Sequence, residues 1–171
     1  MTVAVQTGTW QLDPAASTVA LRHRTLWGLV TVKGTFTAVS GSGEVRPDGS
    51  AAGTVTLDAA SLDTRHAKRD THLRSADFFD AGTHPEITFA VRGADRLDGD
   101  GVRITGQLTV RGIGRPMTLT ARLTGTGADA VTLETEFTVD REQFAMGWNQ
   151  LGMMRGLTTV TAGLRFTRTA S

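Results

Sequence analysis

The sequence predicts an all-β protein of about eight antiparallel strands, folded as one domain over residues 1–171. Three observations lead to this prediction. Apolar and polar residues alternate with a period of two along most of the chain. Short segments rich in Gly, Pro and Asp separate the alternating runs, as hairpin turns require. No repeat, linker or low-complexity segment marks a second domain.

The alternating runs define the strands in chain order, and each run gathers its apolar residues on one face. The first is "GLVTVKGTFTA" (28–38), followed by "GTVTLDAA" (53–60) and "EITFAVRG" (86–93), and four more runs occupy the second half. The residues predicted to share the inward face are Val30, Val32, Phe36, Val55, Leu57, Ala59, Ile87, Phe89, Val91, Val102, Ile104, Leu108, Val110, Met117, Leu119, Ala121, Leu123, Val131, Leu133, Phe137, Val139, Val160, Ala162, Leu164 and Phe166.

Turn chemistry sets the boundaries between these strands. Hairpin turns are predicted at "RPDGS" (46–50), "LDGDG" (97–101), "GIGRP" (112–116) and "TGTGAD" (124–129).

One short helix is predicted near residues 64–75, with Asp63 or Thr64 as its N-cap. Its apolar stripe is thin, mainly Ala67 and Leu73, so it cannot form half of a packed core. We expect it to lie over an open end of the sheet.

The strands are apolar on one face only, and one short helix cannot cover a flat sheet. The apolar faces must therefore cover one another, as a sandwich or as a closed barrel. Several inward positions are small, namely Gly34, Ala59, Gly106, Ala121 and Ala162. They either leave space for a ligand inside a barrel or make room for large neighbours, and the pattern alone leaves both interpretations open.

Five landmarks along the chain are more specific than this pattern. They are "TWQLDPAAS", "RHRTLWGLVTVKGTF", "RDTHLRSADFFDAGTHPEITF", "ITGQLTVRGIGRPMTL" and "VDREQFAMGW". In this order they resemble the YceI-like family, from about Thr9 to Phe166. The resemblance implies a single lipocalin-like antiparallel β-barrel whose lumen holds a polyisoprenoid or similar long apolar chain. The chain departs from the family in carrying Ala16 where a histidine often precedes Ser17.

We therefore expect non-enzymatic binding, sequestration or carriage of a long apolar small molecule, a polyisoprenoid, isoprenoid quinone or similar lipid, with no other cofactor. The residues predicted to contact it in the lumen and at its mouth are Trp27, Phe36, Leu57, Leu73, Phe78, Phe79, Phe89, Leu108, Leu119, Phe137, Trp148, Leu151, Met153 and Met154. The predicted head-group contacts are His23, Arg69 and His72, where a cation would attract an anionic oxygen.

The alternative is a hydrolase or isomerase that acts on an apolar substrate with His72 and Asp70. Asp77 and Asp80 bracket two phenylalanines at the helix exit, a setting typical of turn hydrogen bonds rather than acid–base chemistry. A metal site is not expected, because His66 and His72 fall on different faces of the helix.

Charge and composition exclude some kinds of chemistry and of binding partner. The formal net charge is +1 and the chain has no cysteine, which excludes disulfides and thiolate chemistry. Nucleic acid is not expected, because the aromatic residues share the inward phase of the aliphatic ones.

The chain's ends and late loop carry two further expectations. The segment "MTVAVQTGTWQLD" lacks the features of an export signal, and no apolar run approaches the roughly 18 residues of a membrane helix, so a cytoplasmic location is expected. The Met- and Trp-rich segment 143–157 is interpreted as a pocket mouth, as the contact of a homodimer or as an ordinary loop that covers the core.

Overall fold

The computed structural model describes residues 5–25, 30–125, 127–144 and 157–169. Its strands are β1 (Gly8–Leu12), β2 (Thr18–Thr25), β3 (Val30–Phe36), β4 (Val39–Val45), β5 (Ala51–Asp58), β6 (Leu62–Asp63), β7 (Glu86–Arg96), β8 (Gly101–Val110), β9 (Ile113–Thr124), β10 (Ala130–Val139) and β11 (Thr158–Arg168). Its helical elements are α1 (Ala67–Arg74) and the 3₁₀ turns η1 (Pro14–Ala16), η3 (Ala59–Ser61) and η4 (Arg141–Phe144).

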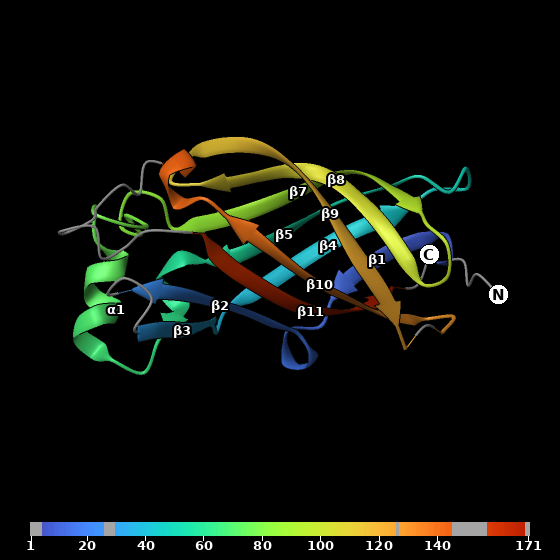
Figure 1. The fold of residues 1–171 in the computed structure, drawn as a ribbon. Coiled ribbons are helices and arrows are strands. Elements are labelled where there is room, and N and C mark those ends of the chain that lie inside the picture. The colour runs from blue at the N-terminus through green and yellow to red at the C-terminus, as the bar shows by residue number, and fades with distance from the viewer. Residues whose placement is uncertain (1–4, 26–29, 126, 145–156, 170–171) are drawn as a thin grey trace.

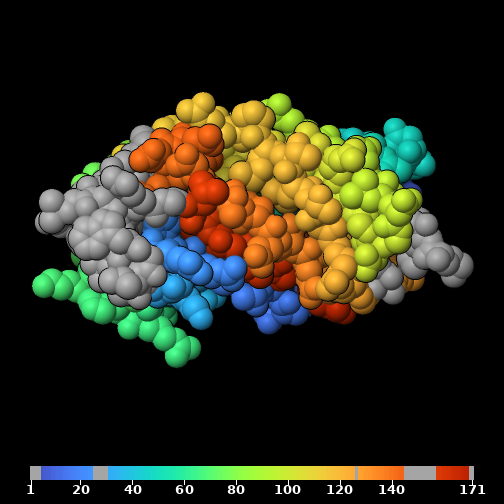
Figure 2. Space-filling model, in the orientation of Figure 1, coloured from blue at the N-terminus to red at the C-terminus, as the bar shows by residue number. Residues whose placement is uncertain are grey.

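Eight of the strands close into an antiparallel barrel, as the sequence predicts. The order around it is β1, β4, β5, β7, β8, β9, β10 and β11, and β11 pairs back with β1. Closure leaves these strands without an open edge along the ring. It also turns one face of each strand toward the inside of the barrel, which accounts for their one-sided apolar pattern. The barrel is elongated, with α1 at one end and both chain termini near the other (Figure 1). The space-filling view shows the same long body, with the green segment that carries α1 projecting at one end (Figure 2).

The edge of β11 is shared by two short strands. Residues 159–163 pair with β2, and residues 166–168 pair with β1. The 3₁₀ turn η1 interrupts the strand between β1 and β2. There the Asp13 carboxylate accepts a hydrogen bond from Ala15 N, and Asp13 N donates to Arg165 O. The hydroxyl of Ser17 accepts from Arg165 N at 3.0 Å, so the break stays attached to β11.

Two local predictions were displaced. The turn predicted at 112–116 lies at Arg111 and Gly112, which have φ of 54° and 72°. Pro116 is already part of β9, where it pairs with Gln107 of β8. Positive φ at both central residues is the signature of a two-residue hairpin turn, which the Gly-Pro pattern obscured. The helix cap was also wrong: His66, not Asp63 or Thr64, is the N-cap of α1, and its Nδ1 accepts from Arg69 N at 3.1 Å.

The apolar residues inside the barrel form two clusters. The cluster at the α1 end includes Phe36, Leu62 and Phe144. The cluster at the other end includes Trp10 and Leu119. Partly buried Phe89 and Met117 pack against both clusters and therefore mark the middle of the barrel.

Candidate functional site

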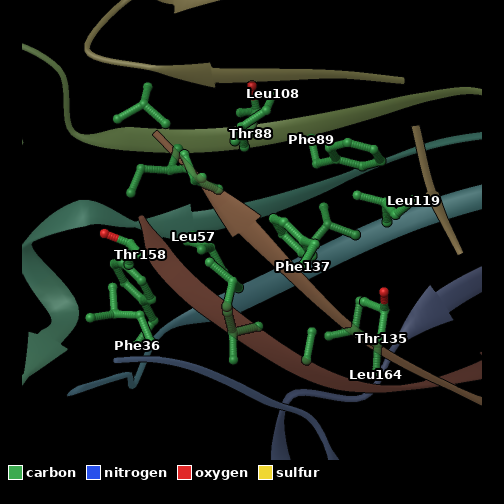
Figure 3. A pocket seen from close by; sticks show the side chains of 18 of the residues that line it. Phe36, Leu57, Thr88, Phe89, Leu108, Leu119, Thr135, Phe137, Thr158 and Leu164 are labelled. Atoms are coloured by element: carbon green, nitrogen blue, oxygen red, sulfur yellow. The ribbon is translucent and has the colours of Figure 1, made fainter. Parts of the chain in front are cut away.

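The α1 end of the barrel encloses an apolar cavity of about 170 Å³. Its lining comes from β2, β3, β5, β7, β8, β9, β10 and β11, from the segment after α1 and from η4, and the side chains of the separate strands converge on one space (Figure 3). The predicted ligand contacts that line it are Phe36, Leu57, Phe79, Phe89, Leu108, Leu119 and Phe137.

These residues meet because each occupies the inward phase of its strand. Cross-strand register places Phe89 opposite Leu108 and Leu57 opposite Ile87, so neighbouring strands present apolar side chains at matching heights. Phe36 and Phe79 pack edge to face with ring centroids 6.1 Å apart. The rings thereby form part of the wall near α1.

A second cavity of about 280 Å³ occupies the other end of the barrel. Trp10, Val102, Ile104 and Leu123 are among its lining residues, and Glu44 and Arg96 make its lining less uniformly apolar. Among the described lining residues, Val55 alone is common to both cavities.

The boundary between the two cavities can be followed along the strands. On β7, Phe89 lines the first cavity and the next inward residue, Val91, lines the second. On β10 the same change occurs between Thr135 and Leu133. The two cavities adjoin at Val55, and we call them the α1 compartment and the terminal compartment; Phe89 lines the α1 compartment where the lining changes from one to the other.

The small inward residues serve different purposes. A Cβ on Gly106 would lie 2.9 Å from Cζ of Phe89, and a Cβ on Gly34 would lie 2.8 Å from Cδ1 of Leu62. These glycines make room for large neighbours. Ala162, in contrast, lines the α1 compartment directly. Ala59 and Ala121 are buried in the two core clusters and line neither cavity.

Two predicted contacts lie beside the lumen rather than on it. Phe78 is buried and packs edge to face on His72, with ring centroids 5.1 Å apart. Leu73 packs against the core cluster at the α1 end. Trp27, Trp148, Leu151, Met153 and Met154 fall outside the described residues.

The predicted head-group residues divide in the structure. His23 is 6% exposed, and its Nδ1 lies 2.9 Å from Oγ1 of Thr158, a residue that lines the α1 compartment. Arg69 instead donates to Thr64 through Nε at 2.8 Å and through its second guanidinium nitrogen to the Thr64 carbonyl at 2.9 Å. It borders a polar outer groove of about 620 Å³.

His72 and Asp70 have separate partners. His72 Nε2 lies 2.8 Å from the exposed Asp77 carboxylate, whereas the buried Asp70 carboxylate accepts from Thr64 N and Oγ1. Neither side chain lines either cavity. The Asp70 contacts anchor α1 to Thr64, the residue that follows β6.

Within the described part of the chain, no three His, Asp or Glu side chains form a group suited to hold a metal ion. The same residues contain no helix with the length and apolar character needed to cross a membrane.

Sequence reasoning missed Arg141. This side chain is 5% exposed and is the one charged group among the described residues that line the α1 compartment. Burial lowers the pKa of its guanidinium, while the neighbouring Glu142 and Asp140 oppose that shift. The signal was its position two residues beyond Val139, where the apolar phase of β10 continues inward.

Comparison with known proteins supplies a family. The family model of the YceI-like domain matches residues 10–166. The curated protein YceI of Escherichia coli O17:K52:H18 is 48% identical over 75 residues, which is 44% of this chain. That match spans 39% of the relative's length.

Solved structures share the fold over more of the chain. Burkholderia cenocepacia BcnA superposes with a TM-score of 0.80 at 22% identity, over 90% of this chain and 98% of that one. A polyisoprenoid-binding domain from Saccharophagus degradans superposes with a TM-score of 0.77 at 15% identity, over 96% and 100% of the two chains. At these identities the likeness establishes a common barrel fold.

Proposed function

The chain belongs to the YceI-like domain family, and from that premise we propose that it binds a long apolar ligand in the barrel lumen without acting on it chemically. The ligand class we propose is a polyisoprenoid, an isoprenoid quinone or a similar chain lipid, which the protein sequesters or carries.

The observation that carries this proposal is the apolar lumen. The α1 compartment is walled by aliphatic and aromatic side chains from most strands of the barrel, a lining suited to hydrocarbon. The Saccharophagus degradans domain, which shares the fold, is itself a polyisoprenoid-binding domain, and that supports the choice of ligand class.

Affinity in such a site grows with the hydrocarbon removed from water. Each buried methylene contributes about 0.8 kcal/mol, from which the cost of ordering the chain is subtracted. Binding therefore strengthens with chain length until the available lumen is full.

The direct experiment is organic extraction of the purified protein followed by lipid mass spectrometry, together with binding of polyprenols of defined length. An isoprenoid lipid in the extract and saturable polyprenol binding are the expected results. Ala162→Phe fills the α1 compartment from β11 and is expected to shorten the longest chain accepted. Thr161→Phe adds the same bulk at the exposed neighbouring position and is the matched control.

Overpacking costs roughly 1–3 kcal/mol, so melting temperatures are measured on both variants. A folded Ala162→Phe protein that binds every chain length like the wild type would contradict lumen binding. Chemical conversion of the polyprenol during incubation would instead favour the hydrolase or isomerase.

A further inference from the structure

The outside of the barrel carries a polar groove of about 620 Å³ beside α1. Its lining comes from β2, β3, β6 and β11 and from the segment between β6 and α1, at the end of the barrel where α1 lies (Figure 1). Among the described lining residues, the charged ones are four cations and one acid, namely Arg22, Lys33, Asp63, Arg65 and Arg69. The other polar ones are threonines. We call this surface the cationic groove.

Two of these cations face each other across neighbouring strands. Register places Arg22 of β2 directly opposite Lys33 of β3. Side chains at such positions start about 5 Å apart, and like charges there are destabilising. Arg22 reaches the carboxylate of Glu136 at 3.4 Å, but both side chains are more than half exposed, and an exposed pair of this kind contributes little. The strand pair therefore carries a repulsion that the fold does little to offset.

The remaining charges of the groove do not offset it either. Lys33 and Arg65 are exposed, and within the described chain neither side chain has a hydrogen-bond or ion-pair partner. The Asp63 carboxylate accepts from the backbone N of Arg65 at 2.8 Å, and it balances at most one of the four positive charges. Arg69 donates to Thr64 through two of its nitrogens, so its charge stays in the groove while its position serves the fold.

We propose that the cationic groove binds a phosphate group, with Arg22, Lys33 and Arg65 as its contacts. A phosphate presents several anionic oxygens, so one group can lie between two cations that otherwise repel each other. A guanidinium binds such oxygens in a bidentate manner, and the lysine adds a compact charge. Threonine hydroxyls of the lining can donate further hydrogen bonds.

The groove is separate from the lumen, and the proposal does not depend on the lumen ligand. Leu21 of β2 contributes to both surfaces, so a phosphate bound in the groove lies on the outer side of the wall of the α1 compartment. Two sources supply this chemistry: a soluble phosphate or pyrophosphate, and the phosphodiester head groups of an anionic lipid surface.

The test uses one probe for each source. Isothermal titration measures binding of inorganic pyrophosphate, and flotation measures binding to vesicles of phosphatidylglycerol mixed with phosphatidylcholine, against vesicles of phosphatidylcholine alone. We expect the wild type to bind at least one probe, and to bind it less tightly as the Debye length falls from about 30 Å to about 8 Å with added salt. Pyrophosphate binding alone identifies a soluble ligand, and binding to the anionic vesicles alone identifies lipid head groups. Binding of neither probe overturns the proposal and leaves the lumen function untouched.

Variants place the binding in the groove. Lys33→Gln and Arg65→Gln are each expected to weaken it at least about tenfold, the effect of one charge-assisted hydrogen bond. Lys68→Gln is the matched control, because Lys68 is an exposed lysine of α1 that is absent from the described lining of the groove. It is expected to bind within about threefold of the wild type. An equal loss in Lys68→Gln and Lys33→Gln would show general charge attraction and contradict a site in the groove.

Thermal unfolding gives a second readout, which a merely structural role of Lys33 would not produce. Without added anion, Lys33→Gln is expected to melt at or above the temperature of the wild type, because the variant lacks the repulsion from Arg22. The probe that binds is expected to raise the melting temperature of the wild type more than that of the variant. A lower melting temperature of Lys33→Gln without anion would mean that the lysine stabilises the fold by itself, and would count against the proposal.

Discussion

Asp70 illustrates how single residues in the charged segment 64–80 serve the fold. Its carboxylate is 7% exposed and accepts hydrogen bonds from the backbone N and the hydroxyl of Thr64. Arg69 grips the same threonine through its hydroxyl and its carbonyl. Arg69 and Asp70 thus hold α1 against Thr64, the residue that follows β6, and their charged groups fix the position of the helix.

We expect Asp70→Ala to lower the free energy of unfolding by about 1–3 kcal/mol, because it leaves two buried donors of Thr64 without their acceptor. Urea denaturation followed by circular dichroism measures the change. Asp77→Ala, which removes an exposed carboxylate from the same segment, is expected to stay within about 0.5 kcal/mol of the wild type. Similar stabilities for the two variants would mean that the clamp contributes little.

At the level of elements, β4 and β5 leave no room for a side chain at Gly53. Gly43 pairs with Gly53 across the two strands, and a Cβ on Gly53 would lie 2.6 Å from Ser42 O and 2.8 Å from Gly43 Cα. Both obstacles are backbone atoms, which cannot move without shifting a strand. Gly43 and Gly53 also line the terminal compartment, so this close pairing shapes its wall.

Gly53→Ala is therefore expected to destabilise the protein by roughly 1–3 kcal/mol through overpacking. Gly163→Ala is the matched control, since Gly163 lies within β11 with nothing within 4 Å of its added Cβ. Its expected effect is neutral or stabilising by up to about 1 kcal/mol. Thermal unfolding of both variants checks the difference, and equal melting temperatures would contradict the steric argument.

The strands also show what a sequence pattern can and cannot predict. Period-two alternation assigned Phe36, Leu57, Phe89 and Phe137 to the inward face, because burial of one face imposes that pattern along the whole strand. The cap at His66 and the turn at Arg111 were missed, because backbone conformation at one or two residues leaves no periodic trace.

The site was predictable to the same extent. The apolar lining follows from the alternation of the strands. That Arg69 lies away from the cavity and Arg141 lines it depends on which groups meet after folding, which the alternation does not record. Arg69 lies among other charged residues in the sequence and was therefore predicted to bind a head group. In the structure its guanidinium donates to Thr64 instead. Arg141 follows the end of β10, where a charged residue is ordinarily exposed. Its inward position is found only when the alternation of β10 is continued two residues beyond Val139.

At the scale of the whole molecule, we expect the boundary between the two compartments to limit the length of the proposed ligand. Phe89 lies at the junction of the α1 and terminal compartments, with its ring packed over Gly106. We expect a chain longer than the α1 compartment to meet this ring before it enters the terminal compartment.

Phe89→Ala is expected to join the two compartments and to raise the longest polyprenol that still gains affinity. Two additional buried methylenes, at about 0.8 kcal/mol each, already correspond to about a tenfold gain. Phe36→Ala enlarges the α1 compartment away from the junction and is expected to leave that length limit unchanged. Titration with polyprenols of increasing length tests both, and an unchanged limit in a folded Phe89→Ala protein would mean that the ring is no barrier.

The shared edge of β11 has a consequence for how the barrel is made. Trp10 pairs with Arg168, so the ring closes between two of the most distant segments of the described chain, and β1 lacks this partner until β11 has been synthesised. Such non-local pairing makes folding slow, because loop entropy is lost before the contact forms. During synthesis the apolar inner wall therefore stays open along one seam. If the proposed apolar ligand binds this wall before the seam closes, it shields the wall from water, and ligand binding is then coupled to closure of the barrel.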